Sequence, residues 1–252
     1  MLIKTAKEIQ FMKEGGERLA QVLAQVLKKV KPGVSLKELD QLAESLIEKK
    51  GGKPSFKMVK GYNWATCINV NQGVVHGIPG NYRLKDSDVV SLDLGIFYKG
   101  MHTDVAKTIR VKEQESRKVK DEFLKAGEKA LKAAIKAAKP GNRVGHISSA
   151  IEKEIKKAGL TPIEALTGHG VGKKLHEPPQ IPCFLREEVK DTPILKPGMT
   201  LAIEVIYTQG KPEVAIKEDG WTVETADGQL AGLFEDTIVV TTKGPLNLTR
   251  LA

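Results

Sequence analysis

Residues 89–109 read VVSLDLGIFYKGMHTDVAKTI, and this stretch decides the fold. Two β-rich runs flank the turn Lys99-Gly100, which indicates a β-hairpin. With these two residues as the loop, Asp93 and Asp104 lie on the same face as diagonal neighbours, about 7–8 Å apart at the backbone. A three-residue loop would put the two aspartates on opposite faces.

Two carboxylates on one face of an apolar hairpin are unfavourable unless each charge meets a cation or a proton. The neighbouring Leu92, Leu94 and Ile96 indicate that the hairpin is buried. One bound metal ion, or a pair of ions, would balance the charge of Asp93 and Asp104. Two exposed aspartates on a sheet surface are the alternative, and this stretch alone leaves both open.

Composition limits the classes of protein. The 252 residues fit one large domain or two small ones, and 40% hydrophobic with 28% charged residues is ordinary for a globular protein with a large core. The net charge of +9 permits contact with nucleic acid or a ribosome, but a lysine-rich solvated surface is the commoner explanation. No RNA-binding motif with interleaved aromatic residues is present, so we expect no sequence-specific nucleic-acid partner.

The cysteine count and the apolar runs bear on the compartment. Cys67 and Cys183 do not make a disulfide framework, which indicates a reducing environment. The N-terminus has no apolar signal core, and no run approaches 18 apolar residues. We therefore expect a cytoplasmic protein with no membrane partner.

Capping boxes predict where two amphipathic helices begin. Thr5 is followed by Glu8 and Ser35 by Glu38, and hydrophobic residues recur behind both at helical spacing. A Lys-Pro-Gly at 31–33 separates these helices, and the same helix–Lys-Pro-Gly–helix unit returns 108 residues later. The later helices span about 117–138 and 144–157, and the β-rich segments span about 64–70, 88–98 and 103–111 in the first half and 162–166, 200–207 and 233–242 in the second.

This repeat predicts an α+β chain of two halves with one plan, about 1–112 and 113–252. With no disordered linker between them, the halves imply a single domain over residues 1–252 with pseudo-two-fold symmetry. Antiparallel strands from both halves should form a central sheet, with helices covering one side of it. A functional site between the halves is the natural expectation.

The second half adds two acidic residues within apolar strands. Glu204 lies in MTLAIEVIY at 199–207, and Glu235 lies in LFEDTIVV at 233–240. A lone glutamate in such a run is usually an edge or solvent-facing residue. Together with Asp93 and Asp104, the two glutamates predict a cluster of four carboxylates.

Three of the five histidines lie in short segments that contain both glycine and proline. His76 lies in VHGIPG, and His169 and His176 lie in GHGVGKKLHEPP. Flanking glycines remove Cβ crowding and let backbone and ring approach a ligand closely, although a turn histidine is the simpler explanation for each alone. We interpret His102 and His146 as structural or surface residues.

Read in order, His76, Asp93, Asp104, His169, His176, Glu204 and Glu235 form a joint pattern. It closely resembles that of the methionine aminopeptidases of the short bacterial type I form, in the pita-bread metallopeptidase family. The resemblance covers nearly the whole chain and depends on three elements: the Asp-x10-Asp hairpin, the Gly-His-Gly-Val-Gly-x3-His segment and the two glutamate strands. It implies a pita-bread fold with a curved antiparallel sheet covered by helices, in a monomer.

The resemblance implies two divalent metal ions per chain, held by Asp93, Asp104, His169, Glu204 and Glu235. In the family, the second aspartate and the last glutamate bridge the two ions, which would lie about 3.5–4 Å apart. Four carboxylates with one imidazole favour Co, Mn or Fe(II), with Zn or Ni as further options.

The implied reaction is removal of the N-terminal methionine from nascent proteins, with a preference for a small second residue. Water activated by the dinuclear metal site attacks the first peptide bond, and Glu204 acts as proton shuttle as well as ligand. His176 hydrogen-bonds the scissile carbonyl or the tetrahedral oxyanion, while His76 contacts the substrate past the cleaved bond and helps to protonate the leaving group. By the same resemblance, the methionine pocket is lined by Tyr62, Cys67, Leu175 and Trp221.

Two rival functions remain. An X-Pro-type aminopeptidase or prolidase of the same fold usually carries a long extra N-terminal domain, which this sequence does not show. A non-catalytic, ribosome-associated binding protein would have lost metal ligands, and this chain keeps all five. The densest basic stretch is the candidate ribosome contact, although a solvated helix end is the simpler explanation; it comprises Lys49, Lys50, Lys53, Lys57 and Lys60.

Overall fold

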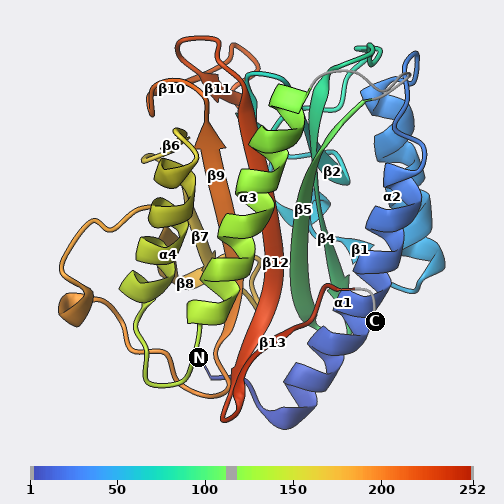
Figure 1. The fold of residues 1–252 in the computed structure, drawn as a ribbon. Helices are drawn as coiled ribbons and strands as arrows, with labels where there is room; N and C mark the ends of the chain where they lie inside the picture. The colour runs from blue at the N-terminus through green and yellow to red at the C-terminus, as the bar shows by residue number, and fades with distance from the viewer. Residues whose placement is uncertain (1–2, 112–117, 251–252) are drawn as a thin grey trace.

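Helices cover one face of an antiparallel sheet in the computed structural model, which describes residues 3–111 and 118–250 (Figure 1). The architecture is therefore the α+β fold that the sequence predicts. No helix in the described ranges is both long and apolar enough to cross a membrane. The four helices are α1 (Ala6–Leu27), α2 (Leu36–Lys49), α3 (Lys118–Ala137) and α4 (Val144–Lys157).

Both predicted capping boxes are present at the starts of α1 and α2. The Thr5 hydroxyl accepts a hydrogen bond from the Glu8 backbone, and the Glu8 carboxylate accepts one from the Thr5 backbone. Ser35 and Glu38 repeat this arrangement. The later helices are also confirmed, except that residue 117, the expected first residue of α3, lies outside the described part of the chain.

Ten strands form the main sheet, whose central path runs β1-β4-β5-β12-β9-β7-β8. On its flanks β2 pairs with β4, β6 with β9 and β13 with β12, while β3, β10 and β11 form a separate small sheet. The strands are β1 (Lys53–Pro54), β2 (Thr66–Val70), β3 (Gly73–Val75), β4 (Val89–Tyr98), β5 (Met101–Arg110), β6 (Thr161–Pro162), β7 (Thr167–Gly170), β8 (Glu177–Pro182), β9 (Thr200–Thr208), β10 (Val214–Ile216), β11 (Val223–Thr225), β12 (Ala231–Thr241) and β13 (Gly244–Asn247).

The β4–β5 hairpin has the two-residue loop that the sequence predicts. Lys99 and Gly100 have positive φ angles of 49° and 84°, as a type I′ turn requires. Tyr98 therefore pairs with Met101, and the register continues unbroken along both strands. Asp104 lies opposite Gly95 in this register, which places it on the same face as Asp93.

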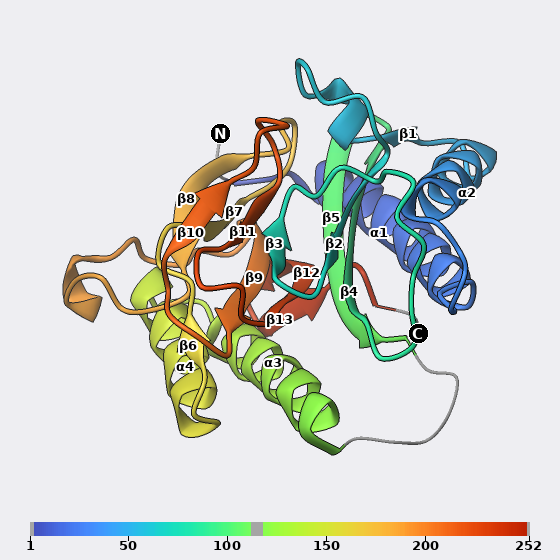
Figure 2. The same cartoon turned by 90° about the horizontal axis from the view of Figure 1, so that it is seen from above.

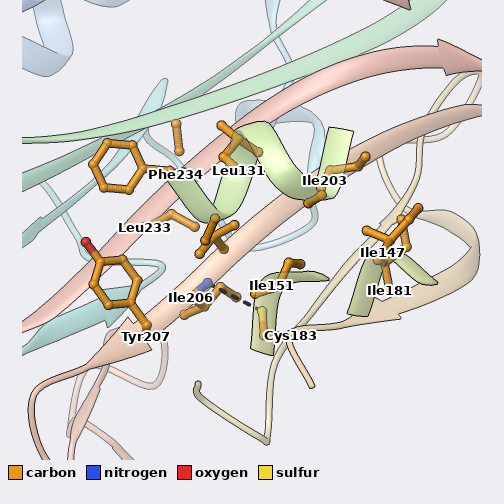
Figure 3. Packing of buried hydrophobic residues seen from close by; sticks show 14 of the residues in the cluster. Leu131, Ile147, Ile151, Ile181, Cys183, Ile203, Ile206, Tyr207, Leu233 and Phe234 are labelled. Carbon is orange, nitrogen blue, oxygen red and sulfur yellow. Dashed lines mark hydrogen bonds between the residues drawn. The ribbon is translucent and has the colours of Figure 1, made fainter. Parts of the chain in front are cut away.

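The two halves meet where β5 pairs with β12 at the centre of the sheet. Figure 2 shows α1 and α2 beside the β4–β5 hairpin and α3 and α4 beside β9 and β12. Each helix pair covers its own hydrophobic cluster. Figure 3 shows part of the cluster beneath α3 and α4, where Leu131, Ile147 and Ile151 pack against residues of β9 and β12.

One predicted strand is wrong. Of residues 162–166 only Pro162 is in a strand, β6, which pairs with β9. The next strand, β7, begins at Thr167, directly after the predicted segment. Two glycines among the four residues of β7 give it a loop-like sequence, and its pairing with both β8 and β9 overrides that local preference. This matters because β7 carries His169.

Candidate active site

A cavity of about 120 Å³ is lined by residues of both halves of the chain. All eleven residues that the sequence singles out for metal, catalysis or the methionine pocket line it. They come from both halves of the chain: Tyr62, Cys67, His76, Asp93 and Asp104 from the first, and His169, Leu175, His176, Glu204, Trp221 and Glu235 from the second.

Three carboxylates lie in a single row across four strands. Asp93 of β4 is opposite Ala106 of β5, Ala106 is opposite Glu235 of β12, and Glu235 is opposite Glu204 of β9. Residues directly opposite one another share a face, so these three side chains project to the same side. Asp104, two residues before Ala106, joins them from the same strand face.

His169 completes the cluster from β7. Ligand atoms of Asp104, His169 and Glu235 all lie within 4.8 Å of one another. The Nε2 atom of His169 is 3.5 Å from Oε1 of Glu204. Side chains from both halves therefore converge on one point, as a shared ion site needs.

The carboxylates are buried next to one another, and this raises their pKa values. Burial raises the pKa of Asp104 to about 7. Burial also raises the pKa values of Asp93, Glu204 and Glu235, and the neighbouring carboxylates add to the effect. Within residues 3–111 and 118–250, no lysine or arginine pairs with any of the four.

Divalent cations fit this donor set. Oδ1 of Asp93 and Oε1 of Glu235 are buried and have no hydrogen-bond partner among the described residues. Unpaired buried oxygens are costly, and a cation is the partner that satisfies several of them at once. Oxygen ligands with one imidazole suit hard or borderline divalent ions.

Local geometry sets the His169 ring for metal binding. Its Nδ1 is 2.9 Å from the Gly170 carbonyl oxygen, which only accepts hydrogen bonds, so Nδ1 carries the proton. The lone pair of Nε2 therefore faces the carboxylates, as in metal-ligating histidines. Burial and the neighbouring His176 lower the pKa of His169 to about 4, which keeps the ring neutral.

The glycines around His169 are required by the chain itself. A Cβ atom on Gly168 would lie 2.6 Å from the Ala202 carbonyl oxygen, and one on Gly170 would collide with the carbonyl of Pro178. These glycines let β7 approach its neighbours closely. The sequence analysis predicts that they admit a ligand, and the close approach visible in the structure is that of neighbouring strands.

His76 and His176 approach the cluster from opposite halves of the chain. The rings of His169 and His176 are 4.4 Å apart in an edge-to-face arrangement. His76 has a positive φ of 55°, an unusual conformation for a residue with a Cβ atom. Desolvation and the proximity of His176 lower the pKa of His76, so the two imidazoles face the cavity as neutral groups near pH 7.

An apolar pocket adjoins the carboxylates. Phe56, Tyr62, Cys67 and Leu175 form one buried cluster, and the Trp221 ring lies edge-to-face with Tyr62 at 5.1 Å. The Tyr62 hydroxyl donates a hydrogen bond of 2.8 Å to the Thr66 carbonyl, which fixes the ring as a wall. Thioethers suit a pocket of aromatic and sulfur-bearing side chains.

Sequence reasoning missed four contributors to this cavity. Phe56, Val59 and Val75 line it, and only Val75 carried a signal, as the residue before His76. Asp40, on the buried side of α2, accepts hydrogen bonds from the Ala65 and Thr66 backbone, of 3.0 and 2.9 Å, and from the Thr66 hydroxyl. It anchors the start of β2 next to Cys67.

The remaining histidines and basic residues lie outside the cavity. Nδ1 of His102 is 2.9 Å from the Ser55 hydroxyl, and His146 accepts a hydrogen bond from the Arg143 backbone at the start of α4, so both have structural roles. In the lysine stretch at 49–60, the ion pair of Lys57 with Glu44 offsets one positive charge, while Lys50 donates a hydrogen bond to the neutral side chain of Gln21.

Comparisons with known proteins agree with this geometry. A profile of metallopeptidase family M24 matches residues 10–242. Methionine aminopeptidase 1 of Bacillus subtilis is 41% identical over the full length of both chains, and the methionine aminopeptidase of Clostridium perfringens is 38% identical over 99% of this chain and 98% of its own.

Solved structures give the same result. The methionine aminopeptidase of Thermotoga maritima superposes with a TM-score of 0.95 at 39% identity, covering 99% of this chain and 100% of its own. A prolidase from Pyrococcus furiosus is more distant, with a TM-score of 0.78 at 26% identity. That alignment covers this whole chain but only 66% of the prolidase.

Proposed function

The chain belongs to metallopeptidase family M24, and we propose that it removes the N-terminal methionine from peptides and nascent proteins with divalent metal ions held by five of its side chains. As a metallo-aminopeptidase, it hydrolyses the first peptide bond of a peptide substrate. The observation that carries the proposal is the meeting of four carboxylates and His169 beside an apolar pocket, with no lysine or arginine paired to any of the four among the described residues.

The proposed metal ligands are Asp93, Asp104, His169, Glu204 and Glu235, and the proposed content is two ions. Asp104 and Glu235 would hold the ions together with His169, since the ligand atoms of these three residues all lie within 4.8 Å of one another. When bound, divalent ions lower the pKa of water towards ~7 and polarise a substrate carbonyl.

The side chains around the ligands divide the remaining work. Glu204 takes the proton from the attacking water on a carboxylate oxygen and passes it to the departing amine. The ring of His176 donates a hydrogen bond to the oxygen of the scissile carbonyl, where negative charge develops. His76 contacts the peptide beyond the cleaved bond.

The pocket of Tyr62, Cys67, Leu175 and Trp221 is the proposed site for the methionine side chain. Its walls are apolar and partly soft, and the carboxylate cluster lies at one end, where it attracts a free α-amino group. A substrate with a blocked N-terminus would bury an amide beside four carboxylates instead. This arrangement restricts cleavage to the first residue.

A single assay separates this function from cleavage before proline. The purified protein is treated with a chelator, reloaded with Mn²⁺, Co²⁺ or Fe²⁺, and given Met-Ala-Ser and Ala-Pro-Ser peptides. We expect metal-dependent release of methionine from the first peptide only. Release of alanine from Ala-Pro-Ser with intact Met-Ala-Ser would assign the X-Pro activity, and no release from either would reject both.

A further inference from the structure

A second hollow, of about 520 Å³, adjoins the candidate active-site cavity. The two spaces share the rings of His76, His169 and His176 in their walls. The far wall of the second hollow includes Thr167 and Gln180. Because the first cavity ends in the apolar methionine pocket, the second is the direction in which the rest of a substrate can leave.

A third and larger space, of about 890 Å³, continues this path. It shares Pro178 and Gln180 with the second hollow, and it lies between β8, the first turn of α4 and the segment 185–196. We call this space the β8 groove. Strand β8 is the last strand at one end of the path of the main sheet, so the groove follows a sheet edge.

The walls of the β8 groove suit an extended polypeptide of variable sequence. Pro178, Pro179 and Pro182 lie along the strand and Pro193 and Ile194 face them from the loop. Proline has no backbone N–H, so β8 cannot pair fully with an added strand. A chain in the groove would instead be held by apolar side-chain contact, which tolerates many sequences.

Gln180 occupies the junction between the second hollow and the β8 groove. Its side chain is exposed, and within the described residues it has no hydrogen-bond partner. A primary amide both donates and accepts, so it can bond to the backbone of a passing chain whatever its side chains. Ile194 is 45% exposed, the largest exposed fraction among the large apolar side chains that line the groove. A bound chain would bury this apolar surface.

We propose that the β8 groove binds the substrate polypeptide downstream of the second residue, in an extended conformation along β8. This inference rests on the proposed function. A six-residue strand spans about 20 Å, so a substrate that fills both spaces needs roughly six residues beyond the cleaved bond. The groove would give an enzyme of nascent proteins extra affinity for long chains without restricting their sequence.

The test compares a long with a short substrate. We would measure kcat/KM for Met-Ala-Ser and for a ten-residue peptide that begins with the same three residues. In the wild-type protein we expect the long peptide to be favoured about tenfold, the effect of burying roughly one apolar side chain. The advantage should lie mainly in KM.

Two substitutions in the groove should remove that advantage. Ile194→Asp and Gln180→Ala should each lower the long-to-short ratio to below about threefold. Ile216→Asp is the matched control, because Ile216 is an exposed isoleucine on β10, away from the groove, and it should keep the ratio. A wild-type ratio near one, or an Ile194→Asp ratio equal to that of the control, would overturn the proposal.

A cross-linking measurement supplies a readout independent of turnover. A ten-residue peptide with a reduced first peptide bond and a benzophenone side chain at its sixth residue should cross-link to β8 or to residues 185–196. Cross-links confined to other surfaces would overturn the groove assignment while leaving the proposed function intact. Failure of wild-type protein to release methionine from either peptide would instead refute the proposed function itself.

Discussion

Glu204 and Glu235 lie directly opposite each other on neighbouring antiparallel strands. Like charges in this position destabilise a sheet, and here Glu235 is buried and only 12% of the Glu204 side chain is exposed. The same row continues to Asp93 across Ala106. The sheet therefore holds negative charge that only protons or bound cations can neutralise, and this links its stability to both pH and metal.

The first prediction concerns the metal-free protein. The pKa of Asp104 is raised from 3.8 to about 7 on folding, so folding is favoured while this group is protonated. Its stabilising contribution is complete below pH ~4 and is lost as the pH rises through about 7. We expect the urea midpoint measured in EDTA to fall between pH 5 and pH 8.

Histidines oppose this trend and must be separated from it. The pKa of His169 is lowered from 6.5 to about 4, so its contribution is present above pH ~6.5 and is lost as the pH falls through about 4. The comparison is therefore made against Asp104→Asn, whose midpoint should fall less between pH 5 and pH 8. Equal pH profiles for the two proteins would contradict the proton linkage.

Added divalent metal should reverse the loss at high pH. Metal binds the deprotonated carboxylates, so its stabilising effect increases as the pH rises. At a free concentration a hundred times Kd, an ion that binds only the folded state adds about 2.7 kcal/mol. A shift of the midpoint by Mn²⁺ that is larger at pH 8 than at pH 5.5 is the expected result, and a pH-independent shift would argue against carboxylate ligands.

The second prediction separates the proposed ligand carboxylates from an adjacent, half-buried one. Asp104→Asn should lower metal affinity by more than about 100-fold, beyond the 10–100-fold typical of residues behind the ligands, and abolish methionine release. Asp236→Asn is the matched control, because Asp236 follows Glu235 on β12 and instead pairs with Thr249 at 2.9 Å. Metal titration by calorimetry should show full affinity in the control.

Local signals explain why the sequence was sufficient for part of this structure. The turn at Lys99 and Gly100 fixes the β4–β5 register without reference to the rest of the chain, so the relation between Asp93 and Asp104 could be derived. Capping boxes act within four residues, and α1 and α2 begin where they predict. That the seven polar residues act together in one site was predicted only from the family resemblance.

Long-range contacts explain what could not be derived. The pairing of β5 with β12 joins residues about 130 positions apart, and no local pattern specifies that Glu235 faces Ala106. The strand of His169 was missed because its glycines suit close approach between strands, which only the neighbours reveal. The anchoring role of Asp40 could not be predicted, because an aspartate in an amphipathic helix usually faces solvent. Here its carboxylate accepts hydrogen bonds from the backbone at the start of β2.

The third prediction concerns the apolar pocket. Trp221 forms one wall against Tyr62, and its loss would open the methionine site to water and to smaller side chains. Trp221→Ala should lower kcat/KM for Met-Ala-Ser by about 10–200-fold, the effect expected when a hydrophobic pocket loses fit. Trp221→Phe should recover most of it. Unchanged selectivity for methionine over leucine in Trp221→Ala would contradict the assignment of this wall.

The fourth prediction follows from an ion pair beside the second cavity histidine. Lys4 and Glu177 are 173 residues apart in sequence, and their Nζ and Oε2 atoms are 2.7 Å apart in a buried setting. The other oxygen of Glu177 accepts a hydrogen bond of 3.0 Å from the Lys174 backbone. The pair thus joins the segment before α1 to the loop that ends in His176.

Breaking this pair should cost stability and disturb His176 together. Lys4→Met leaves a buried carboxylate without its cation, a change that typically costs 3–5 kcal/mol, whereas adding Glu177→Met should restore much of that loss. Lys173→Met is the matched control. Lys173 lies in the same loop as His176 and pairs with Glu8 of α1 at 2.9 Å, but its side chain is 72% exposed. Such surface pairs contribute about 0–1 kcal/mol. Urea unfolding measures the first effect and kcat the second. If Lys4→Met unfolds more easily yet keeps the wild-type kcat, the pair stabilises the fold without positioning His176.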